Sequence, residues 1–356
     1  MRRLIKFFLI ANFALFLSGC WDGTQLDNRG FVTAMSIDIE ENDYSISLEM
    51  PKVSRNVRDM EKTVKSNTHR SLNNAIYGTD TYTDKEIFMG HMKMILCGEE
   101  LLEDSAMFKH ALETLIKERS ISRTVLILAV EGAGADVLEA EIEDENLIGV
   151  YISNFFKKNN PTTIYRQTLD NLTKYFAEGE IAIIPRVEIS DEKPGFSGAA
   201  VMKDYELKGW LTDYELRGLT WLSAKAGRHE LDVHDDDEHF SINIDKYKPN
   251  LSFFELDDEI YALISIKIEG EIEETQIKGN ESTDSIIQKA KSNIEEDIKK
   301  AYEALYIRMG VDGFNMERAF ERKNPYLYRI FTEDRGKDVM DMTIMIEVDV
   351  VVNRTG

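Results

Sequence analysis

The chain has 356 residues, of which 65 are Asp or Glu and 43 are Lys or Arg, so its formal net charge is −22. This acidic balance argues against a nucleic-acid-binding surface, which needs clustered positive charge against the phosphates. Hydrophobic residues make up 43% and prolines number only six, which excludes a largely disordered or low-complexity chain. The length predicts two or three domains, each able to bury a core.

The first 20 residues have the layout of an export signal. Arg2, Arg3 and Lys6 precede an apolar run over residues 7–17, which ends in Leu-Ser-Gly-Cys at Cys20. The run is shorter than the roughly 20 residues that a helix needs to cross a bilayer. A cleaved signal is therefore favoured over a permanent transmembrane helix.

The Leu-Ser-Gly-Cys sequence resembles a bacterial lipobox, in which the cysteine sulfur is acylated before cleavage. We therefore expect residues 1–19 to be a lipoprotein signal peptide and Cys20 to be the lipidation site and first mature residue. The alternative is an ordinary signal peptide that contains an incidental cysteine. Cleavage would change the net charge from −22 to −25, because Arg2, Arg3 and Lys6 are removed. Membrane attachment would then depend on acyl chains and not on anionic headgroups.

The other cysteine, Cys97, ends an apolar run over residues 92–97. A lipidated Cys20 cannot also form a disulfide with it, so the exported chain must be stabilised by its cores. Free cysteine behaves as a small hydrophobic residue, which predicts a buried place for Cys97 in a strand.

The first half alternates strands and helices. Residues 31–39 and 44–50 alternate in polarity around turn residues 41–43, which predicts a hairpin. Periodicity and apolar runs then predict the following elements: a helix at 72–77, a strand at 92–97, one helix at 101–117, a buried strand at 123–130, helices at 147–156 and 168–178, and a strand at 181–189.

Residues 190–195 (Ser-Asp-Glu-Lys-Pro-Gly) form the best linker candidate, because polar residues lead into a Pro-Gly turn. The predicted division is an N-terminal α+β region at 20–193, with room for two subdomains, and a C-terminal α+β domain at 196–356.

The second half begins with a predicted strand at 198–203 and a helix at 212–226. Thr212 is the expected N-cap, with Glu215 completing a capping box. Strands are expected at 240–244, 251–256, 261–272 and 342–352, and a long amphipathic helix at 283–309. Because many strands read as hairpins, the predicted fold class is α+β, multi-domain, with mixed and antiparallel sheets flanked by helices.

Two segments could carry chemistry. The glycine-containing turn at 129–137 follows a strand, but Val137 stands where a dinucleotide-binding turn needs its third glycine, so we expect a simple turn and no cofactor. The acidic segment from His234 to His239 does not match an EF-hand. A solvated loop is expected there, with a weak calcium site as the open alternative, so we predict no metal site.

No catalytic motif is present. His91 and His110 lack a nucleophile partner in the sequence, and His91 is expected to be a hydrogen-bonded structural residue. No catalytic residue and no enzyme activity are predicted. Trp210 and Trp221 flank the start of a helix, where aromatic residues are core residues by default. A partner-binding patch is the alternative for them.

Several segments together resemble the Ger(x)C family, the C-subunit lipoproteins of spore germinant receptors. Gln25, Ser36 and the stretch after Phe314 depart from the family pattern. The resemblance is carried in order by these residues: Cys-Trp-Asp at 20–22 with Leu26, Ile-Asp at 37–38, Gly-His-Met-Lys at 90–93, Gly-Glu-Glu at 98–100, Lys-Gly-Trp-Leu-Thr at 208–212 running to Trp-Leu at 221–222, Asp-Gly-Phe at 312–314 and Val-Asn-Arg-Thr-Gly at 352–356.

The resemblance implies a lipid-anchored, non-catalytic C subunit of a nutrient receptor needed for spore germination. Its implied partners are the integral-membrane A- and B-type receptor subunits, and its implied location is the outer face of the spore inner membrane. The alternative is a membrane-tethered solute-binding lipoprotein that captures a small ligand between its domains.

Overall fold

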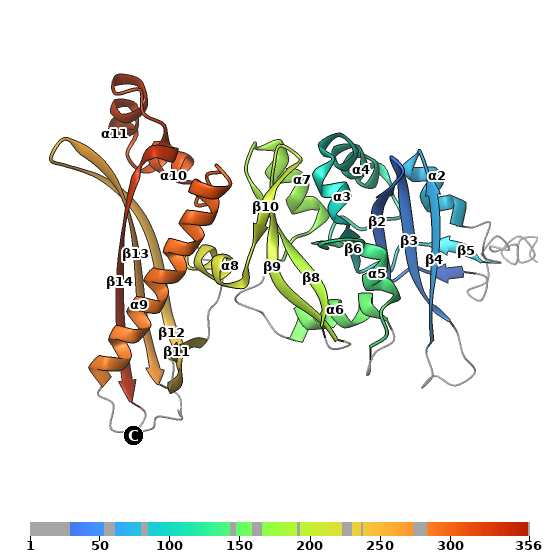
Figure 1. Cartoon of the computed structure of the whole chain (residues 1–356), viewed down its shortest axis with the longest axis horizontal. Coiled ribbons are helices and arrows are strands. Elements are labelled where there is room, and N and C mark those ends of the chain that lie inside the picture. Colours follow the sequence, from blue (N-terminus) through green and yellow to red (C-terminus); the bar gives the residue numbers. More distant parts are fainter. Residues whose placement is uncertain are drawn as a thin grey trace, which may run out of the picture.

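The computed structural model describes residues 29–52, 61–79, 85–142, 147–158, 166–190, 193–222, 230–235, 238–272 and 283–354. Cys20 and the segment before it lie outside these residues. The described chain forms two main sheets, which lie side by side along the long axis of the molecule (Figure 1). The predicted α+β class with mixed sheets flanked by helices is confirmed.

The larger sheet has eight strands in the order β10-β9-β8-β7-β6-β2-β3-β4. Pairing is parallel from β2 through β6 and β7 to β8 and antiparallel at both ends. Its strands are β2 (Ala34–Glu40), β3 (Asp43–Lys52), β4 (Glu61–His69), β6 (Met94–Cys97), β7 (Leu126–Ala129), β8 (Ala182–Ser190), β9 (Lys193–Lys203) and β10 (Glu206–Leu211). A separate parallel pair joins β1 (Arg29–Phe31) to β5 (Glu86–Phe88).

Helices cover both faces of this sheet, because adjacent residues of its buried strands point to opposite sides. Ile95 belongs to one core and Leu96 to the other. The first core includes side chains of α2 (Leu72–Gly78), α3 (Glu99–Glu103), α4 (Ser105–Lys117) and α7 (Leu169–Ala177), and the second includes those of α5 (Gly134–Glu139) and α6 (Ile148–Lys158).

The smaller sheet has the order β11-β12-β13-β14. Helix α9 packs on one face, where the buried residues Ile286, Ala290, Ile294 and Ile298 meet the apolar side of the strands. The elements of this part are α8 (Asp213–Thr220), β11 (Glu230–Asp235), β12 (Glu238–Leu256), β13 (Glu259–Ile272), α9 (Thr283–Tyr302), the π-helix η3 (Glu303–Arg308), α10 (Met316–Lys323), α11 (Pro325–Arg329), η4 (Ile330–Asp334), η5 (Val339–Asp341) and β14 (Thr343–Arg354).

Most of the expected elements are present. The hairpin β2–β3 turns through Glu41 and Asn42, whose φ angles of 51° and 69° are left-handed. The expectation of a single helix over residues 101–117 is wrong, because two helices, α3 and α4, lie there. Asp104 ends α3 and then caps α4, because its carboxylate accepts hydrogen bonds from the amides of Ala106 (3.1 Å) and Met107 (2.9 Å).

Three other expectations in the second half are corrected. The two strands expected at 240–244 and 251–256 are one strand, β12, of 19 residues. The helix expected from 212 to 226 ends at Thr220, and the long helix ends at Tyr302 before continuing as η3. In both helices the sequence pattern overestimates how far regular α-helical bonding continues.

The segment at 190–195, expected to link two domains, lies at the turn of the β8–β9 hairpin, in which Ser190 pairs with Lys193. Residues 193–211 therefore complete the larger sheet. The division of the chain at this point stays a prediction.

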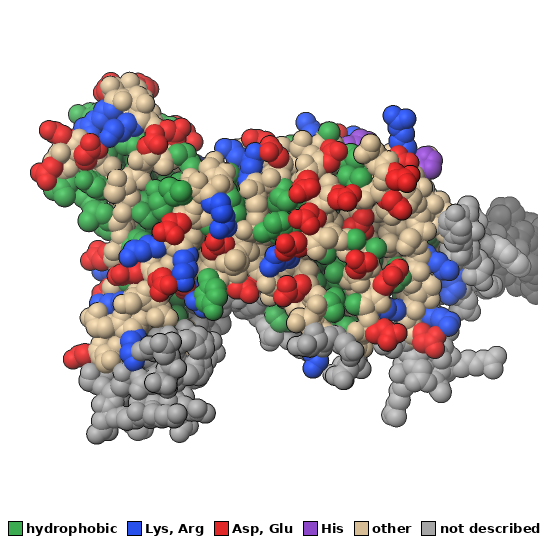
Figure 2. Space-filling model, in the orientation of Figure 1, with side chains coloured by type: hydrophobic (Ala, Val, Ile, Leu, Met, Phe, Trp, Pro, Cys, Tyr) green, Lys and Arg blue, Asp and Glu red, His purple; other side chains and the backbone are tan. Residues whose placement is uncertain are grey.

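The surface carries mixed charge. Figure 2 shows acidic side chains scattered over one face of the molecule, with lysines and arginines between them. The excess of acidic residues therefore does not gather on that face into one highly charged region.

Candidate functional site at the junction of the two sheets

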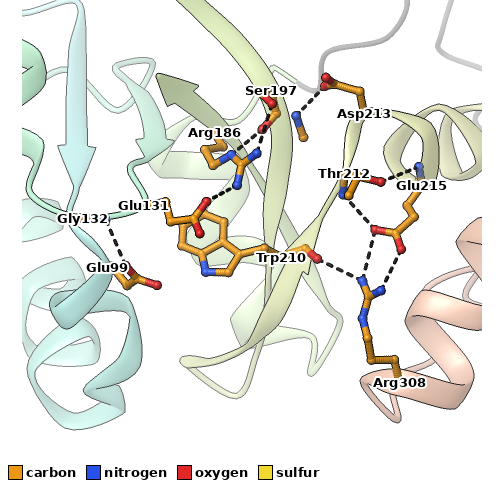
Figure 3. A network of polar contacts seen from close by, with 11 residues as sticks. Glu99, Glu131, Gly132, Arg186, Ser197, Trp210, Thr212, Asp213, Glu215 and Arg308 are labelled. Carbon is orange, nitrogen blue, oxygen red and sulfur yellow. Dashed lines mark hydrogen bonds and ion pairs between the residues drawn. The ribbon is translucent and has the colours of Figure 1, made fainter. Parts of the chain in front are cut away.

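The two sheets meet around α8, and the contacts there form a polar network that connects different parts of the fold (Figure 3). Apolar side chains of β8 and β9, including Ile183 and Val201, belong to the same core as α8, α9 and the smaller sheet. The junction is therefore a packed core with polar contacts around it.

The start of α8 is held by the predicted capping box, which is confirmed. The Thr212 hydroxyl accepts from the Glu215 amide (3.4 Å), while the Glu215 carboxylate accepts from the Thr212 amide (2.8 Å). The same carboxylate binds Arg308 of η3 at 2.8 and 3.1 Å, and Arg308 also donates to the carbonyl of Trp210 (3.1 Å). This arginine fastens the C-terminal part to the β10–α8 connection. Burial alone would raise the pKa of Glu215, but its hydrogen bonds with Arg308 and Thr212 together lower it.

A second arginine links elements near the β10 end of the larger sheet. Arg186 of β8 donates to the Ser197 carbonyl (2.5 Å) and hydroxyl (3.1 Å) and pairs with Glu131 of the β7–α5 turn. Its guanidinium lies 5.7 Å from the centre of the Trp210 ring. Trp210 is half-buried and forms part of the junction.

The contact between α8 and α9 centres on Asp297. This residue is only 3% exposed, and its carboxylate accepts two hydrogen bonds of 2.7 Å from Arg217 and one of 3.1 Å from the Trp221 indole. Gly218 permits this approach, because a Cβ there would lie 1.9 Å from the Asp297 carbonyl oxygen. Trp221 is fully buried, as expected of a core residue.

The glycine-containing turn at 129–137 binds a carboxylate of the chain itself. The Asp38 carboxylate accepts from the amides of Gly134 (2.7 Å) and Ala135 (3.1 Å), which begin α5. Burial raises the pKa of Asp38, although these amides oppose the shift. Because Asp38 fills the place where a phosphate would accept those hydrogen bonds, the arrangement agrees with a simple turn.

A second buried carboxylate, Glu49, holds the start of α6. It accepts from the Thr33 hydroxyl (2.6 Å) and from the amides of Ile148 (2.7 Å) and Gly149 (3.0 Å). Burial raises the pKa of Glu49, although the hydrogen bonds from these three donors oppose the shift. The sequence patterns do not identify Asp38 or Glu49 as buried helix caps, because Glu49 stands at a polar position of the alternating strand β3, where a solvent-facing side chain is expected.

The two histidines occupy structural places. His91 packs its ring 5.5 Å from those of both Phe31 and Phe88, and within the described parts of the chain it has ring contacts and no hydrogen bond. Its expected hydrogen bond is therefore not found there. His110 stacks on Tyr44 and shares a hydrogen bond of 3.0 Å with its hydroxyl.

Cys97 lies buried in β6, as predicted. In the acidic segment His234 pairs with His239 and Asp235 with Glu238, as neighbouring residues of β11 and β12, but the side chains of the segment lie outside the described residues. In the ranges that the structure describes, no three His, Cys, Asp or Glu side chains cluster in a metal-binding arrangement. No helix in those ranges combines the length and apolarity needed to cross a membrane.

Comparison with known families resolves what kind of protein this is. Residues 22–189 match the spore germination protein N-terminal domain, and residues 197–356 match the domain described as spore germination B3/GerAC like, C-terminal. The chain belongs to the Ger(x)C family. This membership supports a role in spore germination.

Individual Ger(x)C relatives align with this chain over most of their length. The chain is 22% identical to spore germination protein B3 of Bacillus subtilis over 86% of this chain and 85% of the relative. It is 20% identical to spore germination protein A3 of the same organism, over 73% and 71% of the two chains. The crystal structure of the GerBC protein has the same fold, with a TM-score of 0.60, 16% identity and coverage of 93% and 99%.

The segments that carry the family resemblance lie largely at structural joints. The Asp312 carboxylate caps α10 by accepting from the amides of Met316 (2.8 Å) and Glu317 (2.9 Å). Gly313 passes so close to Leu305 that a Cβ would lie 2.4 Å from its side chain. Glu99 accepts from the Gly132 amide at 3.0 Å. In this chain these residues hold elements together.

Proposed function

We propose that this Ger(x)C protein is the lipid-anchored, non-catalytic C subunit of a nutrient germinant receptor. The observation that carries the proposal is the position of the family match, which begins at residue 22, two positions after Cys20. A signal peptide ending at Gly19 would leave the whole family region in the exported protein. The junction around α8 would hold the two sheets in one relative orientation. Such rigidity suits a protein that works by binding other subunits.

In this proposal the acylated Cys20 holds the protein on the outer face of the spore inner membrane, where integral-membrane A- and B-type subunits are its partners. Two or more acyl chains are sufficient for a stable anchor without a transmembrane helix. The tether from Cys20 to Arg29, the first described residue, spans at most about 30 Å when extended. β1 would therefore lie near the membrane surface.

The test uses spores that lack this protein and all other germinant receptors of this type, except for the matching A and B subunits. They are complemented with the native chain, with Cys20→Ala or with Cys97→Ala as the matched control. We expect the native chain and Cys97→Ala to restore dipicolinate release to one class of nutrient and to appear in the membrane fraction. Cys20→Ala should restore release poorly and leave that fraction.

Two results would contradict the proposal. Normal nutrient-triggered release without any copy of the chain would remove the receptor role. Full function and membrane attachment of Cys20→Ala would remove the lipid anchor while leaving the receptor role in place.

A second candidate function is capture of a small ligand between the two parts. A groove of about 490 Å³ lies there, lined by residues of the α7–β8 turn and of the α10 region. Arg318 already pairs across it with Glu178 (3.1 Å) and with Glu180, so a zwitterionic ligand would have to replace these contacts. Nutrient amino acids should raise the melting temperature if they bind, since a ligand of the folded state stabilises it. No shift for the native chain, at concentrations that trigger germination, would exclude this function.

A further inference from the structure

Strand β14 is the last strand of the smaller sheet. It pairs in parallel with β13 in unbroken register from Thr343 opposite Tyr261 to Arg354 opposite Ile272. Within the described chain no strand pairs with its other side, which forms one outer edge of the molecule (Figure 1). The backbone groups along that side are therefore available for pairing with an added strand.

This edge has few of the features that commonly prevent strand addition. Proteins protect free edges with prolines, charged side chains (lysine above all), bulges or very short strands, and of these β14 has only charged residues, including Glu347 and Asp349. β14 has 12 residues, reads Thr-Ile-Met-Ile-Glu-Val-Asp-Val-Val-Val-Asn-Arg and contains no proline, glycine or lysine. Met345 and Val351, which alternate to the face away from α9, are 43% and 52% exposed. The edge is long, regular and rich in residues with high strand propensity.

A groove of about 440 Å³ runs beside the edge between β14 and α9. The partly buried residues Ile344 and Ile346 line it together with Met345 and Tyr302. Figure 2 shows hydrophobic side chains gathered beside the upper part of α9. An added strand would place alternate side chains into this groove and the others beside Met345, because side chains of a strand alternate between faces.

Charge decides which kind of strand fits. Glu295 and Glu303 line the groove, and Glu347 and Asp349 are exposed on β14. Two lysines oppose them: Lys299 lines the groove, and Lys291 lies 3.8 Å from Asp349. A second copy of the chain, pairing β14 with β14, would bring these acidic strands together, and like charges on facing strands are destabilising. A strand with basic residues is favoured instead.

We propose that the free edge of β14 binds an extended segment of a partner protein, in which apolar residues alternate with Lys or Arg, by adding it to the sheet as a fifth strand. Main-chain hydrogen bonds would supply affinity, and the groove and acidic residues would select the sequence. This inference deepens the proposed role in a complex by naming the contact surface, but it does not require the lipid anchor.

The test measures amide hydrogen exchange of the full chain with short synthetic peptides as probes. One probe alternates isoleucine with lysine, the second replaces each lysine with glutamate, and the third interrupts the first with a central proline. We expect the lysine probe to slow exchange within residues 343–354 by about tenfold or more, since newly paired amides are protected. The glutamate and proline probes should leave exchange there nearly unchanged.

Two variants locate the effect. Met345→Lys should abolish the protection by repelling the basic probe from the edge. Leu256→Lys is the matched control, because Leu256 is also exposed (51%) but lies at the β12–β13 turn and not on the edge strand. Leu256→Lys should leave the protection intact.

Protection spread over other acidic regions, or unchanged in Met345→Lys, would overturn the proposal. So would concentration-dependent protection of β14 without any probe, which would indicate a second copy. These outcomes are independent of germination. A chain that binds the probe at β14 but is dispensable for germination would contradict the proposed function alone.

Discussion

The Arg217 guanidinium donates two hydrogen bonds of 2.7 Å to the buried carboxylate of Asp297, and this pair joins α8 to α9. The Trp221 indole completes the set of donors at 3.1 Å. A buried carboxylate that loses its cation is costly, because the remaining charge is shielded from water and has no opposite charge beside it. The pair is therefore a sensitive point in the junction.

Arg217→Ala should lower the free energy of unfolding by about 2–3 kcal/mol. This is below the usual cost of breaking a fully buried pair, since the Arg217 side chain is 27% exposed. Urea unfolding, monitored by tryptophan fluorescence, measures this change in the free energy of unfolding. Lys300→Ala, which breaks an exposed pair with Glu296, should have little effect. Equal losses from both variants would show that burial of Asp297 does not matter.

Gly218→Ala should separate α8 from α9. Alanine normally stabilises a helix relative to glycine by about 1 kcal/mol. Here its Cβ would meet the Asp297 carbonyl oxygen at 1.9 Å and the Ala301 side chain at 2.7 Å, and the carbonyl cannot rotate away. We expect a net loss of about 2 kcal/mol or more. Gly195→Ala, where the added carbon has open space, is the control, and a stable Gly218→Ala chain would refute the close approach.

The stability of the N-terminal part should depend on the protonation of Glu49. Burial raises its pKa above the ordinary value of 4.5, so the folded chain holds this proton more tightly than the unfolded chain does. The stabilising contribution is full below pH 4.5 and is lost as the pH rises through the folded pKa.

Glu49→Gln cannot ionise and should lack that loss. The difference in unfolding free energy between Glu49→Gln and the native chain should therefore shift in favour of the variant as the pH rises from 4.5 toward neutrality. Urea unfolding at a series of pH values measures it, with the exposed Glu113→Gln as control. Parallel pH profiles for Glu49→Gln and the native chain would show that the carboxyl is not perturbed.

Cys97 should be unreactive in the folded protein. Burial, with a smaller effect from Asp38, raises the pKa of its thiol to about 12, so only about one molecule in ten thousand carries the reactive thiolate at pH 8. In a Cys20→Ala chain, where Cys97 is the single thiol, Ellman's reagent should react only after denaturation. Rapid reaction of one equivalent in the folded chain would contradict its burial.

Local signals in the sequence predicted most of the elements. The β2–β3 hairpin follows from alternation around a turn, and the start of α8 from the pattern Thr212 to Glu215. The break at Asp104 was missed because apolar periodicity continues across it, although Asp-Ser at 104–105 is itself a cap signal. β12 is a single strand although Pro249 lies within it. Pro249 lies opposite Ile266 of β13. On the other side of β12, pairing with β11 reaches only as far as Asn243, so no β11 residue lies opposite Pro249. A proline has no backbone N–H to donate, and it is tolerated where a strand lacks a neighbour on one side.

The junction itself could not be predicted from the sequence. Its ion pairs join residues far apart in the chain: Arg186 and Glu131 are separated by 55 positions, Arg217 and Asp297 by 80, and Arg308 and Glu215 by 93. Nothing local distinguishes these arginines from exposed ones. Family resemblance marked Glu99, Trp210 and Asp312 without giving their contacts, which only the fold provides.

The β8–β9 hairpin has a practical consequence for exchanging parts between Ger(x)C proteins. A hybrid joined at residue 190 would combine β8 of one protein with β9 and β10 of another, so the larger sheet and its two cores would have mixed ancestry. A join after Leu211, where β10 ends and α8 has not begun, would transfer α8 together with α9 and keep every strand of the larger sheet from one parent. Hybrids joined there would inherit the Arg217–Asp297 pair whole. New compatibility would be needed across the join, including where Arg308 meets Trp210, where Arg318 pairs with Glu178, and where α8 packs on β9.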